Sequence, residues 1–159
     1  MIDHREPPSN GNPPDQAYLT EDGRRLLEER IQLLEATVDE LRAGLDDSEY
    51  RVDSVEGFNR ATQELARLRS LLDGATPVED LADDPEVVEL GDAVAIRLED
   101  GSEERYVLVH AAEAPVEDRR ISVEAPLGRA LLARRVGETV EVTVPVGSYR
   151  CTILSASRR

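Results

Sequence analysis

Residues 20–45 read TEDGRRLLEERIQLLEATVDELRAGL, and this stretch decides the fold of the first half of the chain. Thr20 is a plausible N-cap, and it is followed by Glu21 and Asp22, which the helix dipole favours in a first turn. Gly23 is unfavourable inside a helix, which indicates that another group packs closely against it. Apolar residues then recur in alternating steps of four and three, the spacing of a coiled-coil seam: Leu27, Ile31, Leu34, Val38, Leu41 and Leu45.

A second apolar stripe follows after a short interval, through Val55, Phe58, Ala61 or Thr62, Leu65, Leu68 and Leu72. Neither helix could cover its stripe alone, and the connection is short, so the sequence predicts an antiparallel helical hairpin. The second helix is expected to start between Val52 and Phe58 and to end with Gly74 at the C′ position. Each arm has about 20–26 residues, so the hairpin would project about 30–40 Å.

Acidic residues gather at the bend of this hairpin: Asp46, Asp47, Glu49, Asp53 and Glu56. The arginines of the second arm, Arg60, Arg67 and Arg69, lie away from the bend. One interpretation of the acids is a solvated bend on an acidic protein. The other is a surface that contacts a basic partner or a hard metal ion such as Mg²⁺, which prefers oxygen ligands.

Composition excludes several classes of function. The formal net charge is −15, which argues against direct binding of nucleic acid, because phosphate contacts need clustered Lys and Arg. Aromatic residues make up 3% of the chain and Trp is absent, so no large aromatic pocket is expected. The single cysteine, Cys151, excludes an internal disulfide. With no apolar run of membrane-spanning length and no leader segment, the sequence predicts a cytoplasmic protein without a membrane partner.

Composition and periodicity divide the chain into four segments. We expect a disordered tail over 1–17, the hairpin over 18–74, an acidic linker over 75–86, and a small antiparallel α+β domain over 87–159. Within the last segment, Asp100-Gly101 is a hairpin signal and Pro126 is suited to open a short helix. Cys151 is predicted to be a core residue of the last strand. Strands are predicted at 87–90, 93–98, 104–109, 120–123, 139–144 and 149–154.

Two parts of the sequence resemble the bacterial Gre transcript-cleavage factors. Thr20-Glu21-Asp22-Gly23 and the apolar residues that follow are similar to the opening of that family, and residues 121–132 (ISVEAPLGRALL) and 136–140 (VGETV) are similar to its C-terminal signature. The resemblance covers roughly residues 18–157. It implies an N-terminal antiparallel coiled coil and an FKBP-like C-terminal domain. It also implies a monomer whose partner is RNA polymerase.

The resemblance further implies a mechanism. The C-terminal domain would dock at the rim of the polymerase secondary channel through Glu124, Ala125 and Pro126, and the hairpin would pass down the channel. Two acids at the tip would then help to hold the second catalytic Mg²⁺, so that the polymerase cleaves its own backtracked transcript. The chain itself would be no enzyme, would carry no cofactor beyond this shared Mg²⁺, and would make no sequence-specific contact with nucleic acid.

The tip departs from the family pattern, which is Asp, two residues, Glu, Asn, any residue, Glu, Tyr. One alignment puts Asp53 on the catalytic Glu position and Tyr50 on the Asp position, whereas a rival alignment puts Asp46 and Glu49 on Asp-x-x-Glu. Asp53 and Glu56 repeat the same spacing. Both arms are also shorter than the family norm, by about 5–10 Å. The docking loop is Glu-Ala-Pro where the family usually has Asp-Ser-Pro.

Other functions are consistent with parts of this pattern. The main alternative is a Gre-like inhibitor that occupies the channel without stimulating cleavage. A regulator of the nucleoside-diphosphate-kinase type, which shares this C-terminal domain with a short coiled coil, is a further alternative. A prolyl isomerase is disfavoured because its pocket needs aromatic walls, and the C-terminal half offers only Tyr106 and Tyr149. A hairpin chaperone is disfavoured because the tip is acidic rather than apolar.

Overall fold

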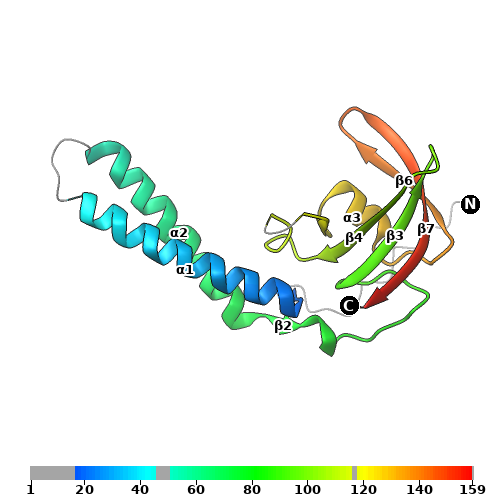
Figure 1. Ribbon diagram of the computed structural model, residues 1–159, viewed down its shortest axis with the longest axis horizontal. Helices are drawn as coiled ribbons and strands as arrows, with labels where there is room; N and C mark the ends of the chain where they lie inside the picture. Colours follow the sequence, from blue (N-terminus) through cyan, green and yellow to red (C-terminus); the bar gives the residue numbers. More distant parts are fainter. Residues whose placement is uncertain (1–16, 46–50, 116–117, 159) are drawn as a thin grey trace, which may run out of the picture.

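The computed structural model describes residues 17–45, 51–115 and 118–158, and of residues 51–53 it describes the helical backbone alone. Two long helices project from one side of a curled β-sheet domain (Figure 1). The molecule is therefore of the α+β class, as the sequence predicts. Within the described ranges, no helix is long and apolar enough to cross a membrane. Residues 1–16 of the predicted tail and the tip residues 46–50 lie outside the described residues.

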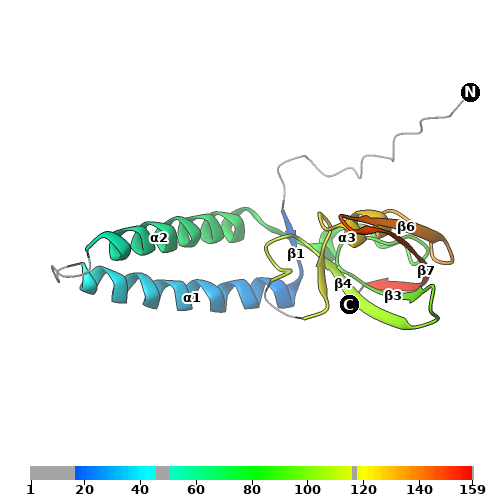
Figure 2. The same ribbon diagram turned by 90° about the horizontal axis from the view of Figure 1, so that it is seen from above.

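Helices α1 (Glu21–Gly44) and α2 (Arg51–Gly74) have 24 residues each and lie side by side in opposite directions (Figures 1 and 2). The predicted stripe of α1 faces α2, with Leu41 half-buried near its end. On α2 the stripe is narrower than predicted, because Val55 is 43% exposed. Gly74 is the last helical residue and its φ is not positive, so the prediction of a C′ glycine is wrong. The two helices pack around one apolar core. It contains Leu27, Ile31, Leu34 and Val38 from α1, and Leu65 and Leu68 from α2.

The base of the helix pair is closed by a two-stranded parallel sheet that the sequence did not predict. Strand β1 (Tyr18–Leu19) precedes α1, and β2 (Thr76–Pro77) follows α2 and leads into a 3₁₀ turn, η1 (Val78–Asp80). Leu19 and Val78 are each only 1% exposed. The start of the acidic segment after α2 is therefore part of the packed structure.

The β domain contains a five-stranded sheet in the order β5-β4-β3-β7-β6. Every neighbouring pair is antiparallel except β4 and β5, which are parallel. The prediction of a purely antiparallel domain is wrong at this edge, because residues 110–115 leave the sheet toward the helices, and Ala112 packs against the helical core. The strands are β3 (Asp92–Leu98), β4 (Glu103–Val109), β5 (Arg120–Ser122), β6 (Thr139–Val144) and β7 (Gly147–Arg158).

Helix α3 (Pro126–Leu131) begins at Pro126, as predicted, and packs against this sheet. The segment 87–90 is not the predicted strand, since it contributes only an isolated bridge between Val87 and Arg135. The predicted Asp100-Gly101 turn joins β3 to β4, and Gly101 has the positive φ of +85° that such a turn requires. The domain core consists of Val88, Val94, Ile96, Leu108, Leu131, Val140, Val142, Cys151, Ile153 and Ala156, so Cys151 is a core residue as predicted.

Candidate functional site

The far end of the helix pair is the first candidate site. Of the predicted tip acids, Asp46, Asp47 and Glu49 lie outside the described residues. Asp53 falls in the first turn of α2, and Glu56 is an exposed residue one turn further on. Carboxylates near a helix N-terminus are stabilised by the helix dipole. Across the residues that the structure describes, no cluster of three or more His, Cys, Asp or Glu side chains could hold a metal ion.

The loop before α3 is the second candidate site. Glu124 and Pro126 are exposed, and Ala125 is the N-cap residue of α3, without a side-chain cap. The loop is held by Ser122, whose Oγ accepts from the Glu124 N–H at 3.0 Å and whose carbonyl accepts from the Ala125 N–H at 3.0 Å. A Cβ on Gly128 would lie 2.0 Å from the Ser122 carbonyl oxygen, so only glycine allows this close turn. The loop backbone therefore holds the exposed residues Glu124 and Pro126 at a defined place on the surface.

A cavity of about 320 Å³ lies beside this loop, with Leu98, Tyr106, Leu127 and Tyr149 among its walls. The Tyr106 hydroxyl donates a hydrogen bond to the Glu104 carboxylate at its edge. This hydrogen bond, together with burial, raises the pKa of Tyr106 to about 12.

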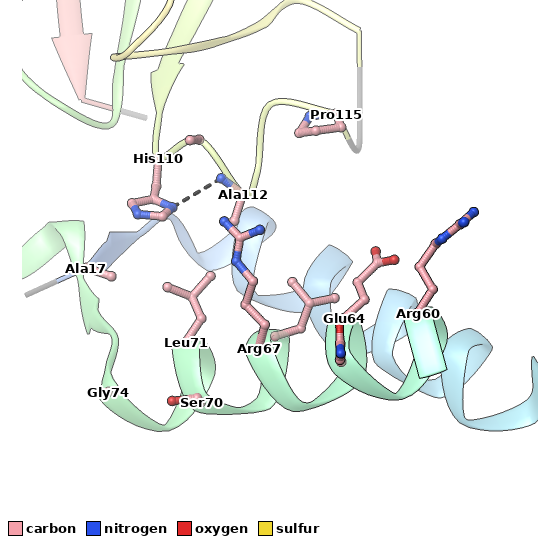
Figure 3. Close-up of a pocket in the computed structure, with 13 residues that line it drawn as sticks. Ala17, Arg60, Glu64, Arg67, Ser70, Leu71, Gly74, His110, Ala112 and Pro115 are labelled. Carbon is pink, nitrogen blue, oxygen red and sulfur yellow. Dashed lines mark hydrogen bonds between the residues drawn. The ribbon is translucent and has the colours of Figure 1, made fainter. Parts of the chain in front are cut away.

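A larger groove of about 800 Å³ separates α2 from residues 110–115 (Figure 3). Arg60 and Arg67 of α2 and His110 at the end of β4 line it. His110 accepts a hydrogen bond on Nδ1 from the Ala112 N–H at 3.2 Å, and burial lowers its pKa, which favours the neutral imidazole. Within the described part of the chain, Arg60 and Arg67 make no ion pair, which leaves two cations on the groove wall of an acidic protein.

The most buried charged group of the described residues joins the two parts of the molecule, and sequence reasoning missed it. Glu113 is 0% exposed; its Oε1 accepts from the Thr20 N–H at 2.9 Å and its Oε2 from the Thr20 hydroxyl at 2.6 Å. Arg120 Nη1 donates to Oε2 at 3.1 Å. Burial raises the pKa of Glu113 despite these donors. The close packing predicted from Gly23 is confirmed, since a Cβ there would lie 1.9 Å from Glu113 Oε2.

A second buried charge fixes the segment after α2 to the β domain. Arg158 Nη1 donates to the Val78 carbonyl at 2.7 Å, and Nε donates to Asp92 Oδ1 at 3.2 Å. Asp92 is 1% exposed and burial raises its pKa. Nothing in the sequence pattern indicates this contact, because Arg158 lies next to the C-terminal residue in an alternating strand.

Comparisons with known proteins agree with this architecture. Residues 83–158 match the family model described as "Transcription elongation factor, GreA/GreB, C-term". The chain is 37% identical over 139 residues to transcription elongation factor GreA of Chloroflexus aurantiacus, covering 86% of this chain and 85% of that protein. It is 32% identical over 131 residues to GreA of Oceanobacillus iheyensis, covering 82% and 80%.

Among solved structures, GreA factor homolog 1 (Gfh1) of Thermus thermophilus aligns with 28% identity and a TM-score of 0.41, over 89% of this chain and 99% of that one. The family assignment does not depend on this structural alignment. It follows from the sequence identity to the GreA proteins, which extends through both the helix pair and the β domain. The chain belongs to the GreA/GreB family of transcription elongation factors.

Proposed function

We propose that this chain binds RNA polymerase as a monomer and modulates transcript cleavage and elongation from within the secondary channel. In this proposal the helix pair is an antiparallel coiled-coil hairpin and the β domain is an FKBP-like docking module. The observation that carries the proposal is the shape of the molecule, in which two 24-residue helices, about 36 Å long, extend from the β domain (Figure 2). The sequence that connects the two helices is rich in acidic residues.

The two candidate sites take different roles in this proposal. Glu124, Ala125 and Pro126 contact the channel rim, and the neighbouring apolar cavity receives a partner side chain. The tip acids approach the polymerase active site, where carboxylates would share the Mg²⁺ that assists phosphodiester hydrolysis. The chain contributes no metal or nucleophile of its own. The proposed tip acids are Asp46, Asp47, Glu49, Asp53 and Glu56.

Inhibition is the second candidate function, and the tip sequence favours it. Residues 46–56 lack the asparagine and the full acidic pattern of the cleavage factors, and the two arms are short. A hairpin that enters the channel but holds its acids short of the metal would block nucleotide entry without promoting cleavage. Docking at the rim would be unchanged.

Transcript cleavage on a backtracked elongation complex tests both functions. The experiment compares the wild-type chain with a variant in which Asp46, Asp47, Glu49 and Asp53 are replaced by Ala, using cognate polymerase and Mg²⁺. A matched control removes four exposed acids outside the tip, Glu79, Asp80, Asp83 and Glu86. RNA shortening that requires the tip acids supports cleavage stimulation, whereas slowed nucleotide addition without cleavage supports inhibition. An absence of binding and of any effect would contradict the polymerase proposal.

A further inference from the structure

We propose that Thr20, Gly23 and Glu113 form a capping box divided between the two parts of the molecule, and that this box fixes the direction of the helix pair relative to the β domain. A capping box normally lies within one turn of one helix. Here one of its members comes from a loop 93 residues further along the chain. The box therefore connects the helix pair to the β domain, and it also caps α1.

The hydrogen bonds match those of a local capping box, one by one. In a local box, the N-cap hydroxyl accepts from the N–H of the third helical residue, and the Glu side chain of that residue accepts from the N-cap N–H. The first bond is present, because Thr20 Oγ1 accepts from the Gly23 N–H at 2.9 Å. The second is made by Glu113, whose Oε1 accepts from the Thr20 N–H at 2.9 Å.

Gly23 is what makes room for the distant carboxylate. A Cβ at this position would lie 1.9 Å from Glu113 Oε2 and 2.1 Å from its Cδ. The φ of Gly23 is not in the left-handed region, so the glycine is needed for space rather than for backbone conformation. Glycine is disfavoured in a helix relative to alanine. A local and a distant capping carboxylate therefore exclude each other, and this chain carries the residue that admits the distant one.

The box restrains the direction of the helix pair because the atoms that Glu113 binds belong to the N-terminal end of α1 itself. Thr20 is held at its backbone N–H and its hydroxyl, neither of which can turn independently of the first turn of α1. On the other side, Glu113 is held by Arg120, which opens β5 at the sheet edge, and Arg120 Nη1 also reaches Thr20 Oγ1 at 3.2 Å. The side chains of Glu113 and Arg120 are buried, so water competes less for their mutual hydrogen bond than it does at exposed ion pairs.

The consequence for activity rests on the proposed function. If the helix pair enters a channel, a turn of about 10° at its base displaces the end of a rod about 36 Å long by about 6 Å. That distance exceeds any hydrogen bond or metal–ligand bond. Glu113 and Arg120 would then be positioning residues for the tip, although they lie at the opposite end of the helices.

A matched pair of glycine variants tests the box on the free protein. Gly23→Ala places a methyl group in the space that the Glu113 carboxylate occupies. The added methyl group of Gly44→Ala, in the last turn of the same helix, meets no atom within 4 Å. Residual dipolar couplings of ¹⁵N-labelled protein report the relative orientation of the helix pair and the β domain. We expect one alignment tensor for the wild type and for Gly44→Ala, and two different tensors for Gly23→Ala. A single, wild-type orientation in Gly23→Ala would overturn the proposal.

Two further variants distinguish a loss of the fixed orientation from a loss of the helix cap and from unfolding. Gly23→Glu supplies a local capping box, so the amides of residues 20 and 23 should stay protected from exchange while the fixed orientation is lost. Glu113→Gln keeps the shape but removes the second acceptor, and should also loosen the orientation. In each variant the amide spectrum of β3, β6 and β7 checks that the β domain is folded. If Gly23→Glu retains the wild-type orientation, the divided box does not set it.

The polymerase assay distinguishes failure of this inference from failure of the proposed function. If the oriented form falls to about a tenth of the population, Gly23→Ala needs about tenfold more protein than Gly44→Ala for the same effect on transcription. Equal activity of the two variants, with orientation lost in one, would overturn the positioning role. If the wild type does not bind polymerase, the proposed function fails, and the dipolar couplings still decide whether the box exists.

Discussion

Removing one partner of a buried ion pair should destabilise this molecule more than removing one partner of an exposed pair. Replacing Arg158 with Met would leave the carboxylate of Asp92 buried without its cation, and breaking a buried pair in this way costs about 3–5 kcal/mol. Urea-induced unfolding measures the loss. Arg150→Met is the matched control, because its ion pair with Glu99 is more than half exposed and should cost at most about 1 kcal/mol. Equal losses in the two variants would contradict this ranking.

The effect of Arg158→Met should also depend on pH. Burial raises the pKa of Asp92 above its ordinary 3.8, so the native state keeps this proton at a pH where the unfolded chain has lost it. The favourable contribution of the protonated form is complete below pH 3.8 and is lost as the pH rises through the native pKa. Without Arg158 the native pKa rises further. The stability difference from wild type should therefore narrow as the pH is lowered from 8 toward 4, and a constant difference would count against the assignment.

Tyr106 offers a spectroscopic test of the cavity beside α3. Its pKa of about 12 lies above the ordinary value of 10, chiefly because it donates a hydrogen bond to Glu104. The native state thus holds this proton between pH 10 and 12, and the associated stability is lost as the pH rises through that window. Ultraviolet titration of wild type, Glu104→Gln and a Tyr106→Phe reference isolates the absorbance step that Tyr106→Phe removes. That step should titrate late in wild type and shift toward 10 in Glu104→Gln. An unshifted titration would show that the hydrogen bond is not its cause.

At the scale of the elements, the two helices are stabilised unevenly along their length. Leu34 is 6% exposed in the middle of the seam, whereas Leu41 is half-buried near the far end. Leu34→Ala should cost about 2–5 kcal/mol and Leu41→Ala less, because a partly exposed site leaves a smaller cavity. Denaturant unfolding of the two variants gives the comparison. A larger loss for Leu41 would mean that the seam is tightest near the bend.

At the scale of the whole molecule, self-repulsion of the net charge of −15 opposes compact folding. Raising NaCl from 0.02 to 0.5 M reduces the Debye length from about 20 Å to about 4 Å and should raise the Tm. An iso-osmolar concentration of an uncharged solute is the control for effects other than screening. A Tm that falls with salt would show that the ion pairs between the helices, such as Arg30 with Glu64, outweigh the repulsion.

The sequence predicted several features that neighbouring residues decide, although the C′ position of Gly74 and the strand at 87–90 were wrong. Thr20 as N-cap, the buried stripe of α1 and the turn at Asp100-Gly101 all follow from spacing within a few residues, and the structure confirms them. The parallel strand β5, the short strands β1 and β2, and Arg158 were missed, because each depends on contacts between distant segments. Gly23 differs from these cases, because a glycine is unfavourable inside a helix and so indicated that another group packs against it. The sequence did not identify that group as Glu113. The tip acids remain a prediction.

The distance along the chain between Thr20 and Glu113 also has a consequence for folding kinetics. A local cap can form as soon as its helix forms, on the microsecond scale, because no long loop must close. The half of the α1 cap that Glu113 supplies requires contact across 93 residues of chain and prior formation of the sheet edge that holds Arg120. The Thr20 amide should therefore gain protection in the last phase of refolding, after the interiors of both helices. The end of α1 nearest the N-terminus would be synthesised first and completed last.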